Sequence, residues 1–174
     1  MTLPRTLALS ALAILPVLPQ QTKQVHPGKG GSPHVETTWT VQGKKITVNY
    51  GRPFAKGRKV FGGLEPYGQV WRAGADEATV FTTEADLMLG SLHVPAGTYS
   101  LFAIPSEKEW TLVLNKTAKQ WGTFSYDQKQ DLGRAPMKVA KAPSTVEQFT
   151  INIEGGHLKL SWGDTIASIP LMVH

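Results

Sequence analysis

The residues best suited to chemistry gather in one segment of the chain, which runs from Arg52 to Thr79. Up to position 72 it carries five cationic side chains against a single Glu, a local charge of +4, and it holds Tyr67 and Trp71 among them. Arginine guanidinium groups bind carboxylates and phosphates, and an aromatic face accepts a sugar ring or a cation. The segment therefore predicts a binding site for an anionic or sugar-containing ligand.

The candidate site residues are the polar and aromatic side chains of this segment: Arg52, Lys56, Arg58, Tyr67, Trp71, Arg72, Asp76 and Glu77. In a structural alternative, Arg52 and Arg72 pair with Asp76 and Glu77 and tie the loop across one end of the domain. A loop this long in a compact domain is often functional. The direction in which these side chains point decides between the two interpretations.

Three classes of function are compatible with this segment. A non-enzymatic binding or envelope-associated domain is the leading hypothesis, because the sequence lacks the Gly-x-Ser-x-Gly and Ser-x-x-Lys nucleophile motifs. The second is a hydrolase or lyase that uses Glu77 or Asp76 with Arg72 and Tyr67. Neighbouring carboxylates in an extended segment point to opposite faces, which makes them a poor acid–base couple by themselves. The third is a purely structural module whose partner docks on an open sheet edge.

The sequence predicts neither a metal site nor a cofactor. Cysteine is absent, which excludes disulfides and thiolate ligands. The five histidines are His26, His34, His93, His157 and His174, and no two of them are spaced i,i+2 or i,i+4. Of the tryptophans, Trp71 and Trp121 lie in irregular segments flanked by glycine, where an exposed ring could stack on a sugar.

The remainder of the chain predicts an all-β fold. Apolar and polar residues alternate over 35–41 and 46–50 around the pair Gln42-Gly43, which is typical of a β-hairpin. Similar patterns predict hairpin turns at Gly90-Ser91, Gly155-Gly156 and Gly163-Asp164. The expected architecture is an antiparallel β-sandwich of about eight to ten short strands. It has one long loop rich in Gly, Pro and Arg, and little helix beyond a turn or two over 116–121.

The N-terminal region predicts export. Residues 1–20 combine one early charge, Arg5, with an apolar run over 7–18, which is typical of a cleaved signal peptide, although no clear cleavage site is present. Residues 21–33 predict a disordered linker, and residues 34–174 predict a single β-sandwich domain. The location would be periplasmic or extracellular, with neither a transmembrane segment nor a lipid-anchor cysteine. Without Arg5 the chain has 17 basic and 13 acidic residues, a mild surplus that argues against nucleic acid as a partner.

A long motif in the same segment points to a known family. The pattern Arg-Pro-x-x-Lys-Gly-Arg-x-x-Phe-Gly-x-Leu-x-Pro-Tyr-Gly-x-x-Trp-Arg-x-Gly-Ala-x-Glu-Ala-Thr, found here over 52–79, resembles the signature of the bacterial domain of unknown function 2911 family. Pro95-Ala96-Gly97-Thr98-Tyr99 and Leu160-Ser161-Trp162-Gly163 fit the resemblance, which extends over about residues 33–171. It implies an exported protein and supplies no catalytic residue.

Overall fold

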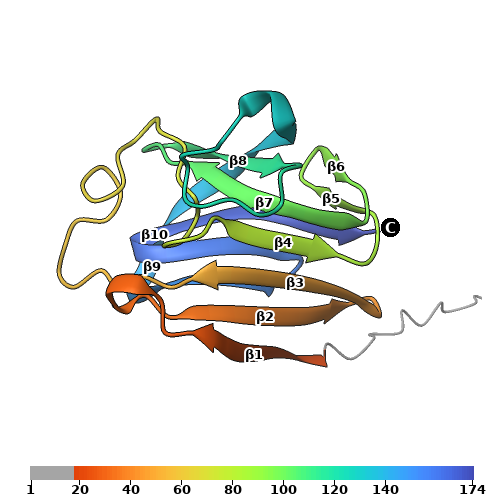
Figure 1. Cartoon of the computed structure of the whole chain (residues 1–174), viewed down its shortest axis with the longest axis horizontal. Coiled ribbons are helices and arrows are strands. Elements are labelled where there is room, and N and C mark those ends of the chain that lie inside the picture. The colour runs from red at the N-terminus through yellow and green to blue at the C-terminus, as the bar shows by residue number, and fades with distance from the viewer. Residues whose placement is uncertain (1–17) are drawn as a thin grey trace, which may run out of the picture.

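The computed structural model describes residues 18–174, whose strands form a single ten-stranded antiparallel sheet (Figure 1). The strands are β1 (Leu18–His26), β2 (His34–Val41), β3 (Lys44–Gly51), β4 (Thr79–Thr83), β5 (Leu87–Leu89), β6 (Leu92–Val94), β7 (Gly97–Ile104), β8 (Glu109–Asn115), β9 (Asp131–Glu154) and β10 (His157–Val173). Two short 3-10 turns, η1 (Lys29–Gly31) and η2 (Gln128–Gln130), are the helical elements among these residues. The predicted all-β class and low helix content are confirmed.

The sheet folds over on itself, because β9 and β10 are long and cross behind β3, β4 and β7 (Figure 1). The strand order is β1-β2-β3-β4-β7-β8-β9-β10-β5-β6. The first part of β9 pairs with β8, and its last part faces β3. There the Tyr50 hydroxyl accepts a hydrogen bond from the Ile151 amide at 3.0 Å and lies 3.4 Å from the Ile151 carbonyl oxygen. The two halves of the sheet thus enclose one hydrophobic core.

The long loop between β3 and β4 contributes to this core. The rings of Phe61 and Trp71 are buried and pack edge-to-face against each other and against Trp110. The backbone of Trp71 exchanges hydrogen bonds of 2.8 and 2.9 Å with Ala103 of β7. Buried aromatic rings contribute large apolar areas, so these contacts hold the loop against the body of the domain.

The predicted hairpin turns are borne out with one exception. Gln42 and Gly43 both have positive φ, as a tight two-residue turn requires, and they join β2 to β3. Gly163, by contrast, lies inside β10, where its φ of 59° accompanies a shift of register against β9. A positive φ serves a β-bulge as well as a hairpin turn. The turn predicted at Gly163-Asp164 is therefore wrong, and the last two predicted strands are one.

The N-terminal boundary also differs from the prediction. The predicted leader, residues 1–20, lies almost wholly outside the described residues. The predicted linker, residues 21–33, is not disordered in this structure. Its first part belongs to β1, which pairs with β2 along its length, and η1 follows. Because the described side chains of β1 are nearly all exposed, this edge strand is held chiefly by backbone hydrogen bonds. Backbone hydrogen bonds do not require particular residue types, so the amino-acid composition did not indicate a strand here.

Residues 116–121 form an irregular loop instead of the predicted helical turn. The Asn115 side-chain oxygen accepts a hydrogen bond from the Thr117 amide, and the Gln120 side chain donates to Ser100 Oγ and to the Thr117 carbonyl. Side-chain bonds of this kind compete with helical backbone bonds. Within residues 18–174, no helix has the length and apolar character needed to cross a membrane.

Candidate functional site

The arginines in the first part of the long loop form hydrogen bonds within the protein. Arg52 donates from Nε to the Phe149 carbonyl at 3.0 Å and from an Nη atom to Thr150 Oγ1 at 2.8 Å. Arg58 donates to the carbonyls of Ala55 and Phe54 at 2.8 and 2.7 Å. These bonds hold the loop to β9 and close its own turn. Neither guanidinium pairs with Asp76 or Glu77, so the bracing differs from the ion pairs of the structural alternative.

The aromatic candidates of the loop point in different directions. The Trp71 ring is 4 % exposed and lies in the core, so it presents no face to solvent. Tyr67 is 39 % exposed and packs over Gly62. It lines a shallow hollow together with Arg58 and Lys59, apart from Asp76 and Glu77. The sequence-predicted cluster of eight residues is therefore divided among at least three places.

Four cationic residues line a hollow of about 330 Å³ between η1 and the loop. We call it the cationic hollow, and its charged lining consists of Lys29, Lys56, Arg58, Glu65, Arg72 and Asp76. The Nε atom of Arg72 is buried and has no hydrogen-bond partner. Burial raises the pKa of Glu65 to about 7, although the nearby Arg72 guanidinium opposes the shift. The hollow combines a surplus of positive charge with a carboxyl group that titrates near neutrality.

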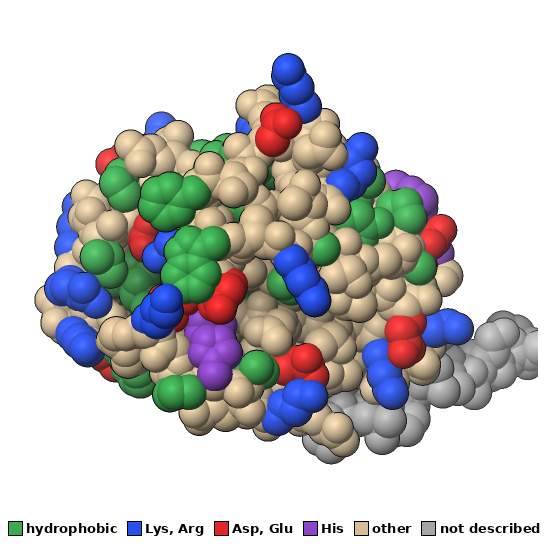
Figure 2. Space-filling model, viewed as in Figure 1, with side chains coloured by type: hydrophobic (Ala, Val, Ile, Leu, Met, Phe, Trp, Pro, Cys, Tyr) green, Lys and Arg blue, Asp and Glu red, His purple; other side chains and the backbone are tan. Residues whose placement is uncertain are grey.

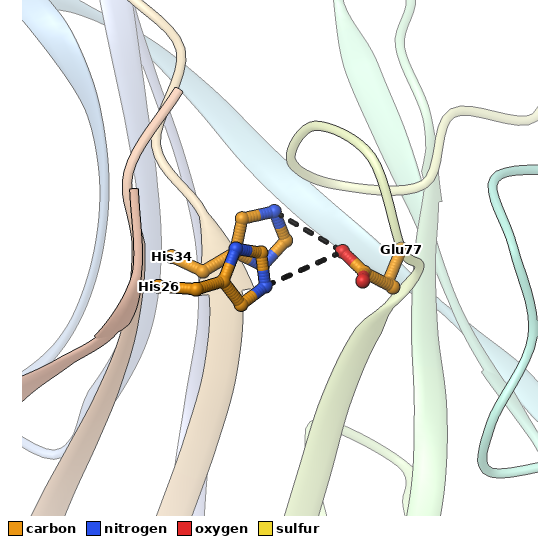
Figure 3. Close-up of side chains that lie close together, drawn as sticks. All are labelled: His26, His34 and Glu77. Atoms are coloured by element: carbon orange, nitrogen blue, oxygen red, sulfur yellow. Dashed lines mark ion pairs between the residues drawn. The ribbon is translucent and has the colours of Figure 1, made fainter. Parts of the chain in front are cut away.

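A second cluster lies where β1 and β2 meet the start of β4. His26 and His34 are directly opposite each other in the β1–β2 ladder, and their rings stack with centroids 4.1 Å apart. Figure 3 shows both rings facing the carboxylate of Glu77. Glu77 Oε2 is 3.3 Å from His34 Nε2 and 3.8 Å from His26 Nε2. Asp76 Oδ2 lies 3.4 Å from His34 Nε2 and accepts a hydrogen bond from the Lys29 amide at 2.8 Å.

His34 is the buried member of this cluster. Its side chain is 2 % exposed, and its Nε2 atom has no hydrogen-bond partner. Burial lowers the pKa of His34 below its usual value, against the opposing charges of Glu77 and Asp76. Gly51 provides the space for the ring, because a Cβ atom at that position would lie 2.7 Å from His34 Nε2. Burial therefore disfavours the charged form of the imidazole, and one of its nitrogens lies close to two carboxylates.

The cluster opens to solvent through a hollow of about 420 Å³, which we call the histidine hollow. Its lining includes His26, His34, Glu77, Gln120 and Trp121. Figure 2 shows histidine side chains beside an acidic group at the edge of this recessed face. Trp121 is 42 % exposed, as its irregular segment predicted, and Lys29 Nζ lies 4.8 Å from its ring centroid.

Sequence reasoning placed Asp76 and Glu77 at a candidate site but missed both histidines and Glu65. His26 and His34 are eight positions apart, a spacing that carries no metal or catalytic signature. They become neighbours only through the antiparallel pairing of β1 with β2. Recognising residues 18–26 as a strand would have predicted this pair, since opposite residues in a ladder bring their side chains together.

The comparison with protein families gives a match over most of the chain. The model of the family described as protein of unknown function (DUF2911) matches residues 32–171. His34, Glu65, Arg72, Asp76 and Glu77 lie within these residues, whereas His26 precedes them. No curated protein and no solved structure matches the chain. The matched residues cover most of the sequence and include the 52–79 motif, so the chain belongs to the DUF2911 family, whose function is unknown.

Proposed function

We propose that this protein is an exported, non-enzymatic domain that binds a small anionic ligand, such as an acidic sugar, in the cationic hollow. The observation that supports this most directly is that Lys29, Lys56, Arg58 and Arg72 all line one solvent-reachable hollow. Glu65 and Asp76 are the two carboxylates in its lining, so cationic groups outnumber anionic ones there. Such a surplus favours a carboxylate or phosphate group.

Arg72 is the central binding residue of this proposal. Leaving a buried polar atom without a partner costs about 1–3 kcal/mol, and Arg72 Nε is such an atom. An anionic oxygen in the hollow would accept a hydrogen bond from this guanidinium. Arg58 keeps its charge although carbonyl groups accept its hydrogen bonds, so it contributes to the potential of the hollow without having to move.

Glu65 makes the affinity depend on pH. With a pKa of about 7, Glu65 gains a proton as the pH falls from 8 to 6, and the hollow then loses a negative charge. An anion whose own charge is constant over this range therefore binds more tightly at pH 6. The charged groups that face the hollow with Glu65 are Lys29, Lys56, Arg58, Arg72 and Asp76.

The test uses isothermal titration calorimetry with sulfate and galacturonate as probes and glucose as the uncharged comparison. Sulfate and galacturonate keep their charge between pH 6 and 8. We expect Arg72→Ala to weaken binding by at least about tenfold, the loss of one hydrogen bond to a charged group. Lys141→Ala, which removes an exposed charge from β9, is the matched control and should bind as the wild type does. Equal losses in both variants, or no binding of either anion by the wild type, would refute the proposal.

The hydrolase or lyase alternative relies on Asp76 and Glu77 with Arg72 and Tyr67. Both carboxylates lie within 3.4 Å of His34, and Tyr67 lines a different hollow from Arg72. Because these four residues do not share one hollow, ligand binding is favoured over catalysis by Asp76, Glu77, Arg72 and Tyr67. Release of product from a galacturonate ester or glycoside by the wild type, abolished in Arg72→Ala, would reverse the order of the two hypotheses.

Export rests on the leader-like sequence of residues 1–20. A cut near residue 20 would leave most of the β1–β2 ladder, from Gln21 onward, intact. N-terminal sequencing of protein recovered from the periplasm or medium of a bacterial culture tests this part. We expect a new N-terminus near Gln21, and a chain that keeps Met1 and stays in the cytoplasm would contradict export.

A further inference from the structure

We propose that His26, His34 and Glu77 bind a divalent transition-metal ion such as Zn²⁺. This site goes beyond the anion-binding function proposed above, because its residues line the histidine hollow instead of the cationic hollow. One ligand atom from each residue lies within 4.8 Å of the other two. Two imidazoles and a carboxylate are a frequent ligand set for zinc in proteins.

The distances fit a metal ion between these atoms. Two atoms that each lie about 2.0–2.1 Å from a tetrahedral zinc ion are separated by about 3.3 Å. His34 Nε2 and Glu77 Oε2 are 3.3 Å apart, so this pair is already at the spacing of two ligands. His26 Nε2 is 3.8 Å from the same oxygen, and its ring also faces the Glu77 carboxylate (Figure 3). Because the two imidazole rings are stacked, the half-exposed His26 ring has to turn before its nitrogen can bind the same ion.

The unpartnered nitrogen of His34 points to the same conclusion. Buried polar atoms in proteins almost always have a hydrogen-bond partner, and each exception needs an explanation. His34 Nε2 is such an exception, even though two carboxylates lie within 3.4 Å. A cation bound to this nitrogen and to a carboxylate would satisfy both groups. The half-exposed side chain of Glu77 leaves a route for the ion from solvent.

Asp76, which lies between this cluster and the cationic hollow, and the open side of the cluster complete the coordination. Asp76 Oδ2 is 3.4 Å from His34 Nε2, within reach of a fourth ligand position, and the Lys29 amide holds it there. Asp76 has a φ of 59°, a left-handed conformation that Asp adopts more readily than most residues. Strained backbone of this kind clusters at functional sites. The histidine hollow would leave a further position for water or a small ligand.

Binding requires one rearrangement at His26. Its Nδ1 atom accepts a hydrogen bond from the Gly28 amide at 3.1 Å, which places the proton of a neutral ring on Nε2. Coordination through Nε2 moves that proton to Nδ1 and breaks the bond to Gly28. His34 and Glu77 are therefore preorganised, and His26 closes on the ion. His26 is the last residue of β1 and its side chain is half-exposed, which allows this movement.

The experiment titrates the metal-free full chain with Zn²⁺ by calorimetry and with Co²⁺ by visible absorbance, which reports a tetrahedral site directly. We expect one ion per chain in the wild type. Loss of a residue that only hydrogen-bonds to a metal ligand weakens metal binding about 10–100-fold. His26 and Glu77 would be ligands themselves, so His26→Gln and Glu77→Gln should each weaken binding by at least about 100-fold. His93→Gln is the matched control, because His93 lies 3.6 Å from Asp86 in a pair that lacks a third ligand.

Several outcomes would overturn the site. These are no ion bound by the wild type, more than one equivalent site, or equal weakening in His93→Gln. Both test positions are half-exposed, so the variants should fold, and their melting temperatures without metal check this. Zn²⁺ should raise the melting temperature of the wild type and of His93→Gln, but not that of His26→Gln or Glu77→Gln. Arg72→Ala should still bind Zn²⁺, and Glu77→Gln should still bind galacturonate, which separates failure of this site from failure of the anion-binding proposal.

Discussion

The two ends of the long loop use the same residue types in opposite ways. At its start, Arg52 and Arg58 donate to backbone and hydroxyl oxygens, so their polar groups have partners inside the protein. At its end, Arg72 Nε is buried and has no hydrogen-bond partner. The same is true of His34 Nε2 on β2, which lies within 3.4 Å of the loop residues Asp76 and Glu77. Since satisfied buried groups stabilise and unsatisfied ones cost free energy, the first arginines serve the fold. The unpartnered nitrogens of Arg72 and His34 are available to a ligand.

The largest effect that this comparison predicts is on stability at Arg52. Arg52→Ala removes the hydrogen bonds to Phe149 and Thr150 that hold the loop to β9. We expect the free energy of unfolding in urea to fall by about 3 kcal/mol, since hydrogen bonds to charged groups contribute about 1.5–3 kcal/mol each. Arg72→Ala, by contrast, should change it by less than about 1 kcal/mol. The reverse order would mean that the unpartnered guanidinium is the structural one.

The fold was largely predictable because turns and strands are local properties. Alternating residues around Gln42-Gly43 predicted β2 and β3. Gly163 was misread, since its positive φ is compatible with either a turn or a bulge, and only pairing with β9 distinguishes them. The loop was recognised as unusual, but its division into a bracing part and a ligand-accessible part depends on which carbonyls of β9 lie opposite Arg52. Such contacts join residues almost a hundred positions apart.

The histidine cluster could not be predicted for a related reason. Once residues 21–33 were interpreted as disordered, His26 had no fixed place, and His34 was a lone residue. The ladder between β1 and β2 sets them opposite each other, and the loop returns Glu77 to the same point. Edge strands such as β1 bury few side chains, so hydrophobic patterning does not reveal them.

The next effect in size concerns the pH dependence of stability. The pKa of Glu65 is about 7 in the folded protein against 4.5 for an ordinary Glu. Between these values the folded state binds more protons than the unfolded state, so stability falls as the pH rises. We expect a loss of about 1–3 kcal/mol between pH 4.5 and 8, since one pKa unit corresponds to about 1.4 kcal/mol.

Glu65→Gln tests this directly, because it keeps the shape of the side chain and removes its charge. Urea unfolding at pH 5 and pH 8 should show a smaller difference for the variant, which should be more stable than the wild type at pH 8. The variant should also bind galacturonate equally at pH 6 and pH 8. A variant with the same pH profile as the wild type would show that another group titrates in the cationic hollow.

The smallest expected effect separates stability from binding at a single position. Lys56 has a φ of 51°, a left-handed conformation that is unfavourable for a residue with a Cβ atom. Lys56→Gly should therefore raise the free energy of unfolding by about 0.5–1 kcal/mol. Glycine relieves the backbone strain and keeps the hydrogen bond that the backbone N–H of residue 56 donates to the Glu147 carboxylate. The same change removes one cation from the cationic hollow, so galacturonate should bind a few-fold more weakly.

Lys59→Gly is the matched comparison for this prediction. Lys59 is exposed, has no positive φ, and lines the hollow of Tyr67 instead of the cationic hollow. Glycine there adds freedom to the unfolded chain without relieving strain, so stability should fall slightly and galacturonate binding should be nearly unchanged. Opposite changes of stability and affinity at Lys56, absent at Lys59, would show that the loop accepts local strain to keep a cation beside Arg72. Parallel changes at both positions would place Lys56 with the bracing part of the loop.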